Sequence, residues 1–75
     1  MLNGEMVRMA RLSMRMTQAE FGDLLGVSAS TIQHVESGRR KVSDTLRARL
    51  VQEVDFEKFV PFFERFNKLD NIISI

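Results

Sequence analysis

The chain has 75 residues, a formal net charge of +1 and no cysteine. A chain of this length forms one domain and buries only about 60% of the surface that it exposes when unfolded, so its core is thin. The absence of cysteine excludes a disulfide framework, a thiolate metal site and a thiol nucleophile, and no apolar run reaches the roughly 18 residues that a membrane span requires.

The first predicted helix covers residues 4–13. Met6, Val7, Ala10 and Met14 recur at helical spacing and are expected to form its buried stripe.

The second predicted helix covers residues 18–25 and is preceded by a capping-box pattern. Thr17 is followed three residues later by Glu20, so each side chain can satisfy the free backbone N–H of the other residue. Gly26 ends this helix, because glycine tolerates the left-handed conformation. Gly22 inside the helix costs about 1 kcal/mol relative to alanine, so we expect the next helix to approach closely there. The inward positions of this helix are Phe21, Leu24 and Leu25.

The third predicted helix, residues 29–37, follows after a tight turn that contains glycine. Ser28 is its expected N-cap, Gly38 ends it, and Ile32 and Val35 face the core. Its opposite face carries small or polar side chains: Ala29, Ser30, Gln33, His34 and Ser37. Two helices joined in this way form a helix-turn-helix, whose second helix enters the major groove of DNA. An ordinary helical hairpin is the alternative interpretation.

A loop over residues 39–42 contains the densest positive charge, Arg39-Arg40-Lys41. Residues 1–50 carry eight basic and five acidic side chains, whereas residues 51–75 carry three basic and five acidic ones, so the charge is polarised along the chain. This favours an anionic partner for the first part, although a solvated loop is also compatible with the triplet. A fourth helix, capped by Ser43 or Asp44, is expected to continue to about residue 54, with Leu46, Leu50 and Val54 facing inward.

A fifth helical stretch is predicted to begin near Asp55. Because Pro61 lacks a backbone N–H, we predict either a kink there or a new short helix that starts at Pro61. Five of the six phenylalanines lie in this tail. The residues expected to contact a second copy or another protein are Phe56, Phe59, Phe63, Phe66 and Leu69. Alternatively, the rings complete the domain's own core. The closing Asn-Ile-Ile-Ser-Ile is apolar enough to add a strand to a partner or to pack on one, or it is a frayed end.

The chain resembles the phage-repressor and Cro-like family of helix-turn-helix regulators, also called the xenobiotic-response-element type. The matching positions are Arg11, Thr17-Gln18, Phe21-Gly22, Gly26-Val27-Ser28, Ile32 and Glu36-Ser37-Gly38. The resemblance covers residues 3–54 and implies a compact, all-α, five-helix lambda-repressor-like domain. Residues 1–54 would be its DNA-binding core and residues 55–75 its Phe-rich tail. Arg15 stands where the family often has glycine, so we expect either a strained backbone at Arg15 or a turn that differs locally from that of the family.

The resemblance also implies residue roles. The candidates for base contacts are Ser28, Ala29, Ser30, Gln33 and His34. The candidates for phosphate contacts are Gln18, Thr31, Ser37, Arg39, Arg40 and Lys41. Arg11 and Glu36 match a structural ion pair that ties the first helix to the third.

We therefore predict a sequence-specific transcriptional regulator, of the phage or mobile-element repressor type, that binds a pseudo-palindromic operator as a homodimer. The alternative is an antitoxin or protein-interaction module whose Phe-rich tail binds another protein. An enzyme is not expected, since the chain has one histidine, no cysteine and no phosphate-cradling glycine loop. We expect no metal, no cofactor and no membrane partner, and we expect a cytoplasmic location in a bacterial or phage-infected cell.

Overall fold

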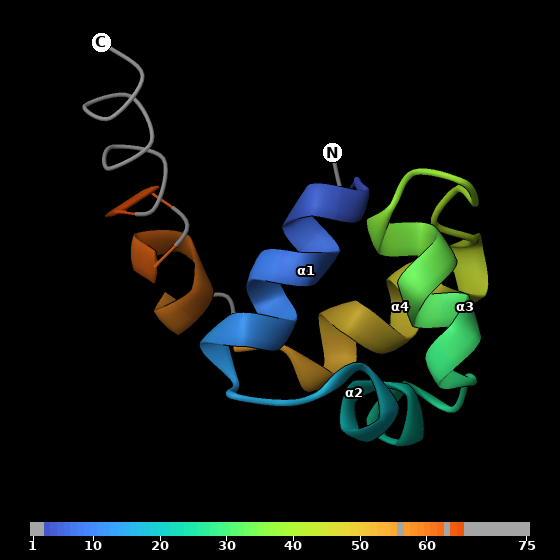
Figure 1. Ribbon diagram of the computed structural model, residues 1–75. Coiled ribbons are helices and arrows are strands. Elements are labelled where there is room, and N and C mark those ends of the chain that lie inside the picture. The colour runs from blue at the N-terminus through green and yellow to red at the C-terminus, as the bar shows by residue number, and fades with distance from the viewer. Residues whose placement is uncertain (1–2, 56, 63, 66–75) are drawn as a thin grey trace, which may run out of the picture.

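Four helices and a fifth helical stretch follow the order predicted from the sequence (Figure 1). The computed structural model describes residues 3–55, 57–62 and 64–65. Its helices are α1 (Gly4–Ser13), α2 (Gln18–Leu25), α3 (Ala29–Glu36) and α4 (Asp44–Glu53), and residues 57–62 and 64–65 are also helical. No strand occurs among these described residues, and the predicted all-α fold with five helices is confirmed.

Side-chain caps determine where the four helices begin. In each cap an oxygen accepts a hydrogen bond of 2.9 to 3.1 Å from a backbone N–H three residues later, and the caps are Asn3, Thr17, Ser28 and Ser43. The predicted capping box is present, because Glu20 Oε1 also accepts a 2.9 Å bond from the Thr17 N–H. This backbone bond, assisted by the Thr17 hydroxyl, lowers the pKa of the Glu20 carboxyl. Local sequence thus specifies the helix starts.

The core takes buried side chains from all four helices and from the fifth stretch. The buried residues are Val7, Met9, Ala10, Phe21, Leu25, Ile32, Val35, Leu46, Leu50, Val54 and Phe59. The buried stripe of α1 differs from the predicted one, because Met9 is buried while Met6 and Met14 lie at the edge of the core. The predicted inward Leu24 is also only partly buried. In the view of Figure 1, α1 appears between α3 and the fifth stretch.

Two glycines mark close backbone approaches. A Cβ atom at Gly22 would lie 2.6 Å from the Val27 carbonyl oxygen, which confirms the predicted close approach, although the turn comes closest and not the body of α3. A Cβ atom at Gly4 would overlap the Val35 carbonyl oxygen and lie 3.1 Å from the Glu36 carbonyl oxygen. The start of α1 therefore crosses the end of α3 backbone to backbone, a contact that the sequence analysis did not identify.

The turn between α1 and α2 contains the strained residue that the sequence predicts. Arg15 has a φ of 56°, the left-handed region in which a side chain is unfavourable. Gly26 ends α2 with a φ of 75°, as expected for a helix that closes on glycine.

The beginning of the Phe-rich tail belongs to the core. Phe59 is only 2% exposed, so the prediction that it contacts a second copy or partner is wrong; the thin core of a small domain takes up this ring. The helical stretch also does not start at Pro61, since residues 57–62 are continuously helical and the Phe59 N–H already donates to the Asp55 carbonyl at 2.9 Å. The other predicted contacts, and the closing segment, lie outside the described residues: Phe56, Phe63, Phe66, Leu69 and 71–75.

Candidate nucleic-acid interface

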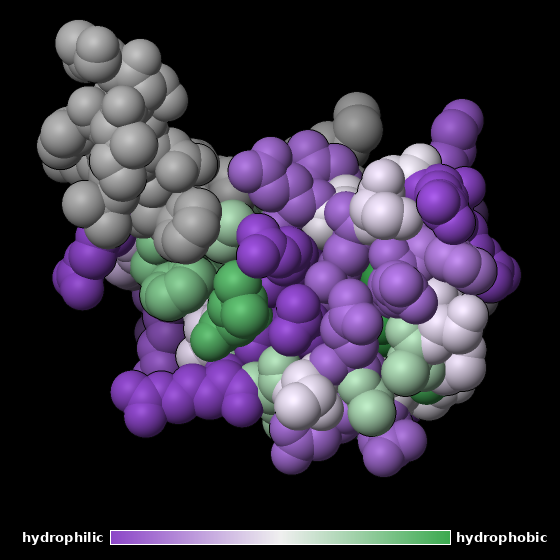
Figure 2. Space-filling view, viewed as in Figure 1, coloured by the Kyte–Doolittle hydropathy of each residue, from purple (hydrophilic) through white to green (hydrophobic). Residues whose placement is uncertain are grey.

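Helix α3 presents one apolar face to the core and one polar face to solvent. Ile32 and Val35 are 0% and 1% exposed, and they hold the helix against the domain. On the opposite side, three base-contact candidates, Ala29, Ser30 and Gln33, are exposed. In Figure 2 the side of the molecule that carries α3 is mostly purple and white, whereas the larger green area lies near the fifth helical stretch. The polar face of α3 is therefore accessible to solvent along these residues.

The ends of α3 carry hydroxyl groups that already have local partners. The Ser28 hydroxyl accepts a 3.1 Å bond from the Thr31 N–H and lies 3.0 Å from the Thr31 hydroxyl. At the other end, the Ser37 hydroxyl donates to the His34 carbonyl at 3.1 Å, and the His34 side chain is half-buried. Ser28, Thr31 and Ser37 thus first stabilise the helix ends and keep limited capacity for a ligand. Ser30 and Gln33 form no internal side-chain hydrogen bond in the described part of the chain.

A polar cluster fixes the orientation of α3 relative to the first two helices. Arg11 Nε donates to Glu36 Oε2 at 2.7 Å, and Arg11 Nη2 donates to Glu36 Oε1 at 3.0 Å. The two side chains are 13% and 5% exposed, so this is the scaffold ion pair that the sequence predicts. A third Arg11 nitrogen, Nη1, donates to the Met16 carbonyl at 2.9 Å and ties the α1–α2 turn to the same cluster.

Gln18 has a partner that the sequence analysis did not foresee. Its side-chain nitrogen donates to Glu36 Oε1 at 3.2 Å, and the residue is half-buried at the first position of α2. Gln18 therefore joins α2 to α3 through the ion pair, besides standing at a helix N-terminus where anions are favoured. No pattern in the sequence reveals this contact, because the two residues are far apart along the chain.

The three cations after α3 lie on one exposed loop. Arg39, Arg40 and Lys41 are exposed, and none of them forms an ion pair within the part of the chain that the structure describes. The loop leaves α3 through Gly38, which has a φ of 82°, and the Arg40 N–H donates to the His34 carbonyl at 3.1 Å. The loop that carries the cations is therefore tied to the end of α3, next to its polar face.

Two further arginines on α4 were counted in the sequence analysis but given no role. Arg49 Nη2 lies 3.4 Å from the Leu24 carbonyl at the end of α2, and Arg47 Nη1 lies 3.4 Å from the exposed Asp44 carboxylate. Their spacing on α4 already predicts that the two side chains lie on different sides of the helix, since residues two apart on a helix do not face the same way.

Comparison with protein-family models matches residues 7–50 to the family described as Helix-turn-helix. The match runs from within α1, through α2 and α3, into α4. Comparison with curated proteins and with solved structures gives no match. In the described residues, no helix combines the length and the apolar character needed to cross a membrane.

Proposed function

Since the chain belongs to the Cro/C1-type helix-turn-helix family, whose domain binds DNA and is not enzymatic, we propose that it is a sequence-specific transcriptional regulator of the phage or mobile-element repressor type. The observation that carries the proposal is the polarity of α3, whose apolar residues are buried while its small and polar residues are accessible. The proposed site of action is the cytoplasm of a bacterial or phage-infected cell, where such DNA lies.

The proposed base contacts lie along α3. The Gln33 amide can pair with an adenine through two hydrogen bonds, and the Ser30 hydroxyl can donate to or accept from several bases. Ala29 offers an apolar contact, for instance with a thymine methyl group. Ser28 and His34 flank this face at the two ends of the helix.

The proposed phosphate contacts surround the same face. Arg39, Arg40 and Lys41 provide charge beyond the end of α3, and phosphate contacts of this kind supply most of the affinity of a DNA-binding domain. Gln18 at the start of α2 can receive a phosphate on the helix N-terminus while its side chain stays on Glu36. Thr31 and Ser37 supplement these contacts through their hydroxyl groups.

We further propose that the protein binds as a homodimer through its tail. A single helix-turn-helix makes few contacts, and a two-fold pair matches two half-sites of an operator. Because Phe59 fills the core, the candidates that remain are Phe56, Phe63, Phe66 and Leu69. Under this proposal, residues 1–54 bind DNA and residues 55–75 form the dimer contact. Phe59 of the tail nevertheless belongs to the hydrophobic core of the domain.

In-vitro selection of duplexes from a random pool tests this function. We expect enrichment of a pseudo-palindrome whose half-sites are centred about 10 base pairs apart. A single enriched half-site would contradict the dimer. A pool without any enriched sequence would contradict base reading, and binding to another protein through the tail would then be the better interpretation.

A further inference from the structure

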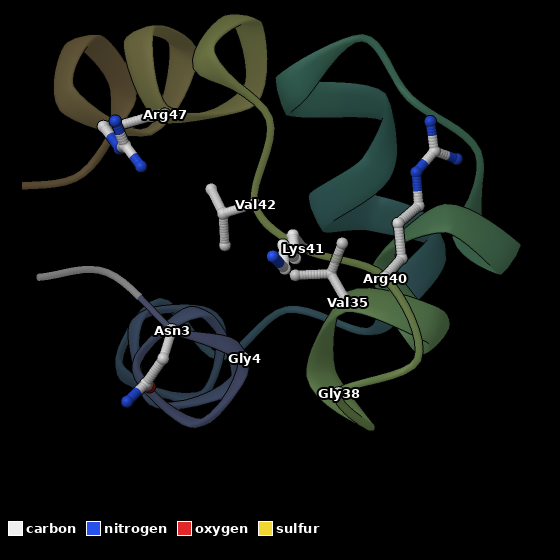
Figure 3. A pocket seen from close by; sticks show the side chains of 8 residues that line it. All are labelled: Asn3, Gly4, Val35, Gly38, Arg40, Lys41, Val42 and Arg47. Carbon is white, nitrogen blue, oxygen red and sulfur yellow. The ribbon is translucent and has the colours of Figure 1, made fainter.

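A groove of about 380 Å³ opens between the start of α1, the end of α3 and the loop that leads into α4 (Figure 3). Val35 and Val42 are the apolar side chains at its floor, and in Figure 3 they point toward its middle. Val35 is only 1% exposed, so Val42, which is half-buried, provides most of the accessible apolar surface. Val35 is on the buried side of α3, so the groove is separate from the polar face that the proposed function assigns to DNA.

The walls of the groove are fixed by backbone contacts. Gly4 crosses the Val35 carbonyl so closely that no side chain fits between α1 and α3. On the opposite side, the Gly38 N–H donates to the Val35 carbonyl at 3.1 Å, and the Arg40 N–H donates to the His34 carbonyl at the same distance. The groove is therefore formed before any ligand arrives, which favours binding because little ordering is required.

The rim of the groove is cationic. Lys41 and Arg47 line it and are both exposed, whereas the Arg40 side chain extends away from the middle (Figure 3). No acidic side chain is among the residues that line it. The nearest competitor for Arg47 is Asp44, at 3.4 Å and with a side chain 99% exposed, and such a surface pair is weak.

An apolar floor beneath two cations selects a particular ligand chemistry. The volume lies within the range of small-molecule sites, about 300 to 1,000 Å³. Inorganic phosphate would use the cations but leave the exposed part of Val42 in contact with water. We propose that this groove binds a small organic anion, with a carboxylate or phosphate on Lys41 and Arg47 and an apolar body of one or two rings on Val42, above the buried Val35.

Occupancy of the groove would also weaken DNA binding. Lys41 lies in both the groove and the proposed phosphate-binding loop, so a bound anion neutralises charge that DNA would use. This second part rests on the proposed function, whereas ligand binding itself does not.

The binding site is tested on the full chain without DNA. We would titrate ¹⁵N-labelled protein with 2-naphthoate, with the neutral 2-naphthylmethanol and with inorganic phosphate, and follow the amide signals of Gly4, Gly38 and Val42. The expected dissociation constant for 2-naphthoate is on the order of 1 mM, which is typical of a ligand of about a dozen heavy atoms, and the alcohol and phosphate should bind about tenfold more weakly. Equal shifts with the alcohol, or shifts spread over the whole surface, would overturn the proposal.

A pair of arginine variants on the same helix makes the test specific. R47A should weaken 2-naphthoate binding about five- to tenfold, whereas R49A, whose side chain lies at the end of α2, should leave it within twofold. Circular dichroism would verify that both variants are folded. Equal effects of the two substitutions would show that only net charge matters and would overturn the site.

The coupling to DNA is tested by measuring the affinity for a random duplex with and without saturating 2-naphthoate. We expect a severalfold loss with the acid and none with the alcohol. If the protein binds no DNA, the proposed function fails and the groove is unaffected. If it binds DNA with unchanged affinity in the presence of the acid, the coupling is wrong.

Discussion

Arg15 is the residue where the local backbone and the side chain conflict most clearly. Its φ of 56° places a Cβ in the left-handed region, at a strain of about 1 to 2 kcal/mol. R15G should raise the free energy of unfolding by about 0.5 to 1 kcal/mol, because the relieved strain exceeds the added flexibility of the unfolded chain. Urea denaturation measures this. R15A, which removes the charge but keeps the Cβ, is the matched control, and an R15A protein as stable as R15G would refute the strain.

The Arg11–Glu36 pair is the second residue-scale feature with a large effect on stability. With 5% exposure of the Glu36 side chain and 2.7 Å between Nε and Oε2, removal of one partner leaves the other charge buried and unpaired. R11M and E36L should each lower the free energy of unfolding by about 3 to 5 kcal/mol, whereas the double variant should recover a large part of this loss. Additive losses in denaturation experiments would argue that the pair is not coupled.

At the scale of elements, the crossing of α1 over α3 depends on Gly4. G4A should lower the free energy of unfolding by about 1 to 3 kcal/mol, because its Cβ would overlap the Val35 carbonyl and force the two helices apart. E5A, at the next and exposed position of the same helix, should change stability by no more than about 0.5 kcal/mol. Helix propensity favours alanine at both sites and would therefore raise the stability of both variants. Thermal denaturation that shows a loss for G4A alone would attribute the loss to the close crossing of α1 and α3.

The elements could be predicted from the sequence where their cause is local. Thr17, Ser28 and Ser43 cap the helices as expected, and Gly26 ends α2. Burial of Met9 could not be predicted in this way, because it depends on which elements cover α1. The sequence also did not show that the helix continues through Pro61, because the helix has already begun before this residue. Pro61 has no N–H to bond the Glu57 carbonyl, but Glu57 is exposed, so this carbonyl can bond to water.

In the candidate site, too, features set by one helix could be predicted from the sequence, whereas contacts between separate helices could not. The polar face of α3 follows from helical spacing around Ile32 and Val35, and the resemblance to a family indicated the ion pair. The bond from Gln18 to Glu36 and the groove beside Val42 arise where separate helices meet, and spacing along one helix says nothing about them.

For the whole molecule, the loop after α3 should govern the dependence of DNA binding on salt. Replacing both Arg39 and Arg40 with alanine should weaken binding to every duplex and reduce the salt slope by about 2, since each phosphate contact contributes about 0.9. Fluorescence anisotropy between about 50 and 200 mM salt measures the slope. R47A, which removes one charge from the groove, serves as the control and should change the slope much less. Equal slopes for the wild type, the double variant and R47A would show that the loop does not contact phosphates.

The accessibility of the α3 polar face to bases is tested most directly by Q33A. Its dissociation constant, and that of the wild type, would be measured at one salt concentration on the selected operator and on a random duplex. We expect a loss of about 1 to 3 kcal/mol on the operator alone, because Gln33 is exposed and free to pair with a base. An equal loss on both duplexes, or no loss on the operator, would contradict base reading by this helix.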